Sequence, residues 1–395
     1  MPDTRVKLNA ARNSSASIGE MILEAFTKSN AMVSLAVVLL GFLVGTILIL
    51  AVGRNPGSMY SAILQVVSGW DLRRGSQNTR YIGEWLVSSM PLILCGLSMG
   101  FAARTGLFNI GAEGQYAAGI TAAQIAALYF PSVPMLHWMM AVLAAVIAGA
   151  AWGGIAGFLK ARFNVSEVVA TIMMNYMALY FSRIITMRLP GTNTYRTPDL
   201  PKTALLKNSF LEAVSNGSRL NYGLFLTIAA VLFYWLVMEK TRLGYSLRAT
   251  GLNKDAARYG GISVNAGITT AMAISGAFAG LAGAIVSLGS FNYGRVLSVM
   301  DGYGFDGIAV ALVGNSTALG TALSGLLFGM LKSAQPLMQL KQIPKEITSI
   351  ILGLVVVFIS LRAGVLIIIE WQLKEKARKA QKIKNADEAE GGGNA

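Results

Sequence analysis

The sequence has few of the residues on which disulfides, metal sites and acid–base catalysis depend. It contains one cysteine and one histidine in 395 residues, which excludes a disulfide within the chain and a cysteine-rich metal site. A membrane-embedded hydrolase would need a nucleophile beside a base. The single histidine, His137, adjoins Trp138 at the edge of an apolar segment, where an interfacial role explains it. The sequence therefore predicts no metal site and no enzyme.

Motifs for ATP binding and for secretion are also absent. No Gly-x-x-x-x-Gly-Lys-Ser/Thr occurs, so the chain is not an ATPase of the P-loop type. Residues 1–30 are polar and of mixed charge, without a short apolar core that leads to a small-residue cleavage site. We interpret them as a cytoplasmic tail and not as a signal peptide.

Charged residues are scarce, and this defines the class of protein. They make up 13% of the chain, against about a quarter in soluble domains, while 54% of the residues are hydrophobic. Apolar windows of about 20 residues recur, each long enough to cross a bilayer as a helix, and the alternation of an outer-membrane barrel is missing. The net charge of +14 comes from Lys and Arg in the loops, which fits anionic lipid headgroups better than nucleic acid. The sequence predicts an all-α polytopic membrane protein.

About ten membrane crossings are predicted, so both termini lie on one side of the membrane. A weak excess of Lys and Arg places that side in the cytoplasm. The chain then divides into a cytoplasmic tail (1–30), a transmembrane domain (31–369) and a basic, disordered cytoplasmic tail (370–395). The segment 303–332 is interrupted at Gly314-Asn315-Ser316 and counts as two crossings, the first a short helix of about twelve residues. The other predicted spans are Ala31–Gly53, Gly83–Ala103, Gly111–Phe130, Leu136–Leu159, Ser166–Met187, Tyr222–Val237, Asn265–Ser287 and Ile347–Ile369.

Polar side chains interrupt the apolar pattern between the second and third spans. Arg104, Asn109, Glu113 and Gln115 stand there among glycines. An ionisable residue at bilayer depth is by default a functional-site hypothesis.

A second segment resembles this one, as in transporters built from two halves of opposite topology. Glu113-Gly114 is matched by Asp306-Gly307, an acidic residue and a glycine that open a helix in both places. Ser166–Ile172 likewise resembles Lys345–Ile350, and each begins a long span with a glutamate in its first turn. The pattern predicts an inverted repeat with a short broken helix.

The longest polar loop on the predicted inner side runs from Glu239 to Ile262. Its alternation of apolar and basic residues predicts short helices broken at Gly251, shaped to enter a groove of another protein. The alternative is an amphipathic loop that rests on lipid headgroups.

Three motifs together resemble one family. They are Thr105-Gly-Leu-Phe-Asn-Ile-Gly-Ala-Glu-Gly-Gln115, Ser166-Glu-Val-Val-Ala-Thr-Ile-Met-Met-Asn-Tyr176, and Ala249-Thr-Gly-Leu-Asn253 with Ala256-Ala-Arg-Tyr-Gly-Gly-Ile262. They are similar to the permease subunits of bacterial ABC importers for simple sugars and nucleosides, and the first motif resembles the nucleoside-type branch most.

This resemblance implies a multi-pass subunit of the bacterial cytoplasmic (inner) membrane. Its implied partners are a cytoplasmic ATPase, a second permease and an extracytoplasmic substrate-binding lipoprotein. The chain itself holds no cofactor, since ATP and Mg²⁺ bind the ATPase. Two copies or two different permeases both remain open.

The resemblance also implies two sets of functional residues. Asp255-Ala256-Ala257 followed by Gly260 resembles a Glu-Ala-Ala coupling motif, although the downstream Ile-x-Leu-Pro is missing. The residues expected at the ATPase contact are Gly244, Arg248, Gly251, Asn253, Asp255, Ala256, Ala257, Arg258 and Gly260. Those expected along the substrate pathway are Asn109, Glu113, Gln115, Asn175, Phe291, Tyr293 and Asp306.

Several pathway residues have a plainer alternative. Glu113 and Asp306 are equally suited to cap the helices that they open. Asn109 is equally suited to cap the helix that starts near Gly111, and Glu113 to neutralise Arg104. Phe291 and Tyr293 are also typical of an interfacial aromatic belt.

The resulting functional prediction is inward transport of nucleosides, or of a related ribosyl or simple-sugar compound, driven by ATP hydrolysis in a partner. The alternative is an ion-coupled secondary transporter that uses Glu113 and Asp306.

Overall fold

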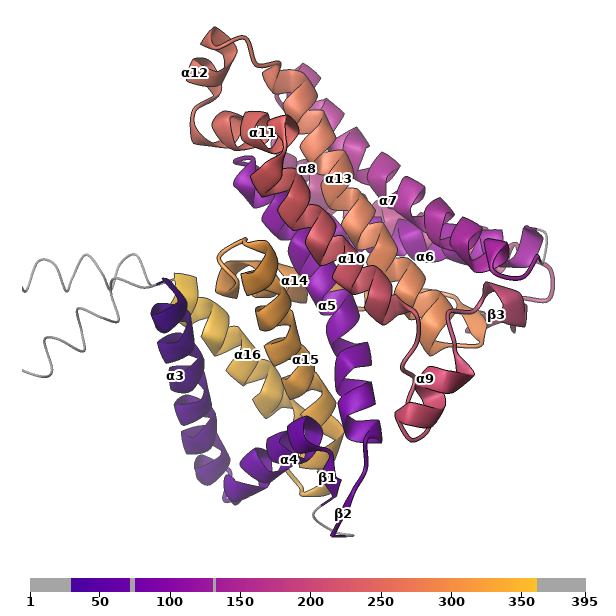
Figure 1. Cartoon of the computed structure of the whole chain (residues 1–395), viewed down its shortest axis with the longest axis vertical. Helices are drawn as coiled ribbons and strands as arrows, with labels where there is room; N and C mark the ends of the chain where they lie inside the picture. The colour runs from indigo at the N-terminus through magenta and orange to yellow at the C-terminus, as the bar shows by residue number, and fades with distance from the viewer. Residues whose placement is uncertain (1–29, 72–74, 131–132, 361–395) are drawn as a thin grey trace, which may run out of the picture. The chain divides into compact units, whose positions relative to one another are not determined.

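The computed structural model describes residues 30–71, 75–130 and 133–360. These residues form fourteen α-helices, three further helical turns and four short strands (Figure 1). The two predicted tails, residues 1–30 and 370–395, lie outside the described residues except for Asn30, which begins the first helix.

The chain divides into two compact units, one of residues 1–45 with 351–395 and one of residues 46–350. Two helices reach into the first unit, α3 (Asn30–Ala51) and α16 (Lys345–Ser360). Gly45 lies against Ile351, so closely that a Cβ on Gly45 would stand 2.5 Å from Cδ1 of Ile351. The predicted last span, Ile347–Ile369, is described only as far as Ser360.

The second unit holds the elements that position the candidate sites. In chain order they are α4 (Gly57–Ser68), β1 (Trp70–Asp71), β2 (Ser76–Gln77), α5 (Arg80–Arg104), α6 (Ala112–Tyr129), α7 (Leu136–Phe163), α8 (Glu167–Met187), β3 (Arg196–Asp199), η1 (Lys202–Ala204), α9 (Ser209–Val214), α10 (Gly223–Trp235), η2 (Leu236–Lys240), α11 (Arg242–Leu252), α12 (Lys254–Tyr259), α13 (Val264–Ile285), η3 (Val286–Ser290), β4 (Tyr293–Arg295), α14 (Tyr303–Val313) and α15 (Ala318–Leu340).

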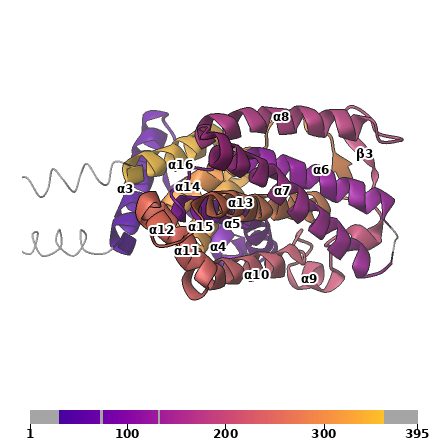
Figure 2. The same cartoon turned by 90° about the horizontal axis from the view of Figure 1, so that it is seen from above.

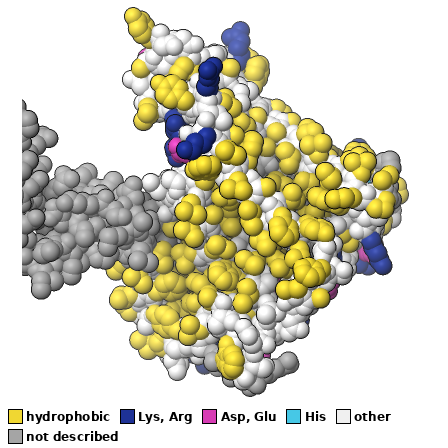
Figure 3. Space-filling view, in the orientation of Figure 1, with side chains coloured by type: hydrophobic (Ala, Val, Ile, Leu, Met, Phe, Trp, Pro, Cys, Tyr) yellow, Lys and Arg dark blue, Asp and Glu magenta, His cyan; other side chains and the backbone are white. Residues whose placement is uncertain are grey.

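Five helical segments of this unit are long and apolar enough to cross a membrane. They are Arg80–Arg104, Leu136–Phe163, Glu167–Met187, Gly223–Lys240 and Val264–Ser290. Hydrophobic side chains cover most of the surface that Figure 3 shows, and Lys and Arg gather toward the α11 and α12 end. The apolar part of this surface is suited to contact with lipid, and the basic end is suited to contact with water. The prediction of a polytopic, mainly helical membrane protein is therefore confirmed.

The close contact of α7 and α13 depends on small residues. A Cβ on Gly276 would lie 2.1 Å from the carbonyl oxygen of Gly149, and one on Gly153 would lie 2.3 Å from that of Met272. Small residues four positions apart let two helices pack backbone to backbone. In a membrane such packing replaces the hydrophobic effect as the force that holds helices together. In Figure 2 these two helices overlap through the middle of the unit, and α13, together with α5, is the most enclosed of the apolar segments.

The predicted interruption of segment 303–332 is confirmed. The helix α14 ends at Val313, and α15 begins at Ala318. Between them Asn315 and Ser316 both take left-handed backbone conformations, with φ of 53° and 51°, which residues other than glycine adopt uncommonly.

Two further expectations need correction or addition. The polar inner loop is not broken at Gly251, which lies inside α11, but at Asn253, whose side chain accepts hydrogen bonds from Asp255 N and Ala256 N at 3.0 Å. Asparagine is a favoured N-cap because it satisfies the first N–H groups of a helix.

The short helices α4 and α9 were not predicted, because twelve and six residues give too little periodicity to recognise.

The long loop that follows α8 folds onto the end of α13. Strand β3 pairs antiparallel with β4, Leu200 N donates to Asn292 O at 2.8 Å, and Leu206 N donates to Leu288 O at 3.0 Å. Leu200 and Leu206 are buried, so this segment packs against the unit. It lies at the end of the unit opposite to α11 and α12 (Figure 1).

Candidate functional site

The polar residues at the start of α6 form a buried hydrogen-bond network. Asn109 Nδ2 donates to Gln115 Oε1 at 2.9 Å and to Ser275 Oγ at 2.7 Å, and Gln115 Nε2 donates to Asn109 Oδ1 at 3.1 Å. The Ser275 hydroxyl continues to Ser98 O at 2.6 Å. All four side chains are buried, so the network ties the segment before α6 to α5 and α13.

Asn109 also turns the backbone into α6. Its Oδ1 accepts a hydrogen bond from Gly111 N at 3.0 Å, which agrees with the capping interpretation, although Gly111 itself is the cap residue. Side chains of this type often close the turn before a helix in this way.

Glu113 stands where the N-termini of two helices meet. It lies in the first turn of α6, and its two carboxylate oxygens accept hydrogen bonds from Gly302 N at 2.8 Å and Gly304 N at 2.6 Å, at the start of α14. Both helix ends carry partial positive charge, which a carboxylate offsets. Glu113 therefore does not neutralise Arg104, as one interpretation held, and Arg104 pairs with Glu239 instead.

Asn175 binds the backbone at the N-terminus of α6, as Glu113 binds that of α14. Its Oδ1 accepts from Gly114 N at 2.8 Å, and its Nδ2 donates to Ile110 O at 3.0 Å. The side chain comes from the middle of α8 and is buried. Asn109, Glu113, Gln115 and Asn175 thus gather around the entry of α6, while Asp306 points elsewhere and forms an ion pair with Lys332 of α15.

The aromatic pathway candidates lie at the other end of α13. The rings of Phe291 and Tyr293 are 5.8 Å apart, and each has an arginine over its face. Arg295 Cζ is 5.0 Å from the centre of the Phe291 ring, and Arg196 Cζ is 5.3 Å from that of Tyr293. Cations are attracted to such ring faces.

A cavity of about 220 Å³ opens beside Phe291. Its walls come from the first half of α5, from the π-helical turn η3, from the start of α14 and from the loop before α10. The lining residues are Val87, Ser88, Pro91, Arg219, Val286, Ser290, Phe291, Arg295, Asp301 and Tyr303. Of the predicted pathway residues it contains Phe291 alone.

Two ion pairs border this cavity. Arg295 Nη1 and Nη2 donate to the two oxygens of Asp301 at 2.5 and 2.7 Å, and Arg219 donates to Glu84 Oε2 at 2.6 and 3.0 Å. The hydrogen bond that Arg295 donates to Asp301 raises the pKa of Arg295, and the one that Arg219 donates to Glu84 raises the pKa of Arg219. Both guanidinium groups therefore stay charged.

Sequence reasoning missed Arg219, Arg295, Asp301 and Tyr303 because each stands in or beside a loop with no recognisable motif. One local signal existed in the sequence, the turn-forming dipeptide Asp301-Gly302. Asp301 precedes a glycine with φ of 84° that opens α14. In the part of the chain that the structure describes, no group of three His, Cys, Asp or Glu side chains is placed to hold a metal ion.

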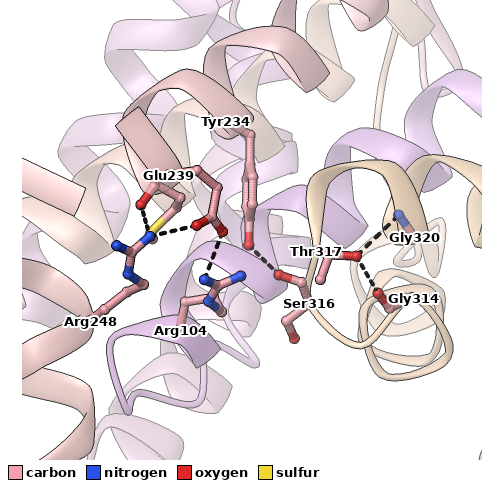
Figure 4. Close-up of polar contacts among 9 residues, drawn as sticks. Arg104, Tyr234, Glu239, Arg248, Gly314, Ser316, Thr317 and Gly320 are labelled. Atoms are coloured by element: carbon pink, nitrogen blue, oxygen red, sulfur yellow. Dashed lines mark hydrogen bonds and ion pairs between the residues drawn. The ribbon is translucent and has the colours of Figure 1, made fainter. Parts of the chain in front are cut away.

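At the opposite end, Glu239 of η2 links three elements (Figure 4). Its Oε1 accepts from Arg104 Nη2 at 2.8 Å, at the end of α5, and its Oε2 accepts from Arg248 Nη1 at 2.7 Å, in α11. Arg248 Nη1 also donates to the carbonyl oxygen of Met238. The predicted coupling residue Arg248 is thus held by the helix that precedes its own.

The same segment reaches the break between α14 and α15. Tyr234 Oη donates to Ser316 O at 2.6 Å, and Thr317 Oγ1 accepts from Gly320 N at 3.1 Å to cap α15 (Figure 4). The stretch from Tyr234 to Glu239 therefore contacts both the helix break and α11.

The remaining predicted coupling residues differ in their surroundings. Gly251 lies against the turn at Arg104 to Gly106, where its Cβ would stand 2.7 Å from Arg104 O, and Gly244 lies against Val237 O. Ala257 is buried, whereas Ala256, Arg258 and Gly260 are exposed, and Asp255 is 3.9 Å from Arg258.

Two large apolar side chains on this loop were not singled out from the sequence. Leu252 is 88% exposed and Tyr259 is 98% exposed, at the ends of α11 and α12. Both stand beside the exposed basic residues Lys254 and Arg258.

Comparison with known proteins agrees with the motif resemblance. A family model described as the branched-chain amino acid transport system permease component matches residues 81–360. A guanosine ABC transporter permease of Bacillus subtilis is 40% identical over 84% of this chain and 93% of its own. A nucleoside ABC transporter permease of Lactococcus lactis is 35% identical over 88% and 95%, and a glucose ABC transporter permease of Haloferax volcanii is 32% identical over 70% and 75%.

No solved structure matches the chain. The comparisons favour no ion-coupled alternative, and they confirm the resemblance to ABC importer permeases. The chain belongs to the family of the branched-chain amino acid transport system permease component.

Proposed function

We propose that this chain is the permease subunit of an ABC importer that moves nucleosides into the cytoplasm. The observation that carries the proposal is the similarity, over 84% and 88% of the chain, to a guanosine and a nucleoside ABC transporter permease. A simple-sugar substrate has less support, because the glucose permease is less similar and covers less of the chain.

We further propose the architecture expected from the sequence: ten crossings, an inverted repeat, and both termini in the cytoplasm of a bacterial inner membrane. The meeting of α6 and α14 supports the repeat. These two helices start from broken segments, and their N-termini face each other across Glu113, as half-helices from two opposed repeats do.

The ATPase contact is proposed at α11 and α12. The exposed Leu252 and Tyr259 supply apolar anchors of the kind that dominate protein interfaces, and Arg248 connects them to Glu239. The same proposal includes a second permease, identical or different, and an extracytoplasmic binding lipoprotein that delivers the substrate.

Uptake tests the function directly. Cells that express the chain with its ATPase, sister permease and lipoprotein should accumulate radiolabelled guanosine, and a catalytically dead ATPase should abolish this. Uptake that persists with the dead ATPase, or accumulation of no nucleoside, would contradict the proposal.

Co-purification tests the contact. Leu252→Asp and Tyr259→Ala should each lower the amount of ATPase that purifies with the permease, by about tenfold or more for an interface anchor. Tyr195→Ala is the matched control, since Tyr195 is 79% exposed on the loop at the opposite end. Equal recovery of the ATPase with all three variants would place its contact elsewhere.

A further inference from the structure

The cavity between α5, η3 and α14 is large enough for a ring system but smaller than pockets that hold a whole drug-sized ligand. Its volume is about 220 Å³, whereas pockets for drug-sized ligands run from about 300 to 1,000 Å³. Phe291 offers an aromatic wall, and Ser88, Ser290 and Tyr303 carry hydroxyls on the other walls. A flat ring with hydroxyl or amide edges meets both kinds of surface.

The charges around this cavity cancel. Arg295 is held by both oxygens of Asp301, and Arg219 is held by Glu84. Each pair already uses two of the guanidinium donors that could otherwise bind a phosphate. An anionic ligand would have to displace a carboxylate that is already in place, while an uncharged ligand leaves both pairs intact.

The nearby helix N-termini are also occupied. Gly302 N and Gly304 N donate to Glu113, and Gly114 N donates to Asn175. Free N–H groups at a helix start form a ready anion site, and these three N–H groups already donate to side chains. Two independent features thus disfavour a phosphate.

We propose that this cavity is a substrate subsite that receives the uncharged ring of a nucleoside and discriminates against nucleotides. The proposal rests on the proposed nucleoside transport. Phe291 stacks on the ring, the serine hydroxyls pair with its polar edges, and the compensated arginines prevent a phosphate from gaining affinity.

Cysteine labelling in the assembled transporter tests this subsite. The one native cysteine, Cys95, is fully buried, so Ser290→Cys supplies a reactive thiol in the cavity, with Ser88→Cys on the α5 wall as a second variant. Ser209→Cys, on the exposed start of α9, is the matched control. Guanosine at about ten times its dissociation constant should slow labelling in the cavity about tenfold, and should leave the control unchanged.

Guanosine 5′-monophosphate at the same concentration should give no protection. Protection of neither cavity position by guanosine, equal protection of the control, or equal protection by the monophosphate would each overturn the proposal. If guanosine uptake itself is absent in the unmodified transporter, the proposed function fails. Uptake without protection would overturn the subsite alone.

A second variant tests the charge balance. Asp301→Asn in the Ser290→Cys background leaves Arg295 without its carboxylate. The labelling rate of an anionic thiol reagent should then rise about fourfold and that of a cationic one should fall about fourfold, a change of about sixteenfold in their ratio, which is the effect of one unit charge about 5 Å away in water. The monophosphate should then protect. Glu212→Gln, an exposed carboxylate on α9, should change neither ratio. An unchanged reagent ratio with Asp301→Asn would show that Arg295 is not compensated as argued.

Discussion

Oε2 of Glu113, in the first turn of α6, lies 2.6 Å from the backbone nitrogen of Gly304, in the first turn of α14. A Cβ on Gly304 would stand 2.2 Å from the Glu113 nitrogen, so the two helix starts are in direct backbone contact. Two positive helix ends at this distance repel unless a negative group lies between them. Glu113 supplies that group and both acceptors.

Glu113→Ala should therefore destabilise the protein strongly. It leaves two backbone donors, of Gly302 and Gly304, unsatisfied at about 1–3 kcal/mol each. Glu113→Gln keeps one acceptor oxygen and should lie between Ala and the parent. Thermal unfolding in detergent measures the order, and Glu212→Ala, on the exposed α9, is the control. Loss of uptake by Glu113→Gln at unchanged stability would instead indicate an ionisable transport group.

Neighbouring glycines of α7 should respond in opposite ways to one methyl group. Gly153→Ala places a Cβ 2.3 Å from Met272 O, whereas the nearest atom to a Cβ on Gly154 is 3.6 Å away. Overpacking costs about 1–3 kcal/mol, while alanine at the open position removes the helix penalty of glycine. Gly153→Ala should lower the unfolding temperature and Gly154→Ala should hold or raise it. A similar fall for both would show that α7 and α13 do not meet through Gly153.

Much of this fold followed from the sequence because apolar length alone marks a membrane helix. The break at Gly314 to Ser316 was also visible, since Gly-Asn-Ser is typical of a turn and asparagine tolerates the left-handed conformation that follows α14. We predicted the other break at Gly251, two residues before its observed place at Asn253. Gly251 looks like a breaker, but it serves as the point where α11 touches the turn at Gly106.

The sites were less accessible to sequence reasoning. Asn109, Glu113 and Gln115 were recognised as polar residues in an apolar setting, but only the structure shows that Asn109 bonds to Ser275 and Glu113 to the start of α14. These contacts join residues more than 160 positions apart, and no local pattern encodes such distances. The pathway function of these residues remains a prediction.

Gly251→Ala should impair transport without preventing insertion. Its Cβ would meet Arg104 O at 2.7 Å and force α11 away from the end of α5, at a cost of about 1–3 kcal/mol. We expect guanosine uptake to fall about tenfold while the ATPase still co-purifies. Gly267→Ala, in the first turn of α13, is the control, because the nearest atom to a Cβ there is 3.6 Å away. Equal uptake by both variants would show that the α11 contact has no part in coupling.

Glu239 and Arg248 should act as one unit in transport. Glu239 also holds Arg104, and the three side chains are 23–38% exposed, so the ion pairs add only about 0.2–1 kcal/mol each to stability. Their larger effect is positional, because η2 carries both Glu239 and the carbonyl that binds Arg248. Glu239→Gln and Arg248→Gln should each lower uptake, and the double variant should lose little more than either alone.

A second cycle in the same loop provides the comparison. Asp255 and Arg258 are 3.9 Å apart, with side chains 95% and 68% exposed, a geometry in which exposed pairs are weakly coupled. The effects of Asp255→Asn and Arg258→Gln on uptake should therefore add, since additivity fails only where residues share a contact network. Measuring uptake per ATP hydrolysed in both cycles separates the two cases. Additive effects of Glu239→Gln and Arg248→Gln would mean that the bridge seen at η2 does not transmit the movement of α11 to the end of α5.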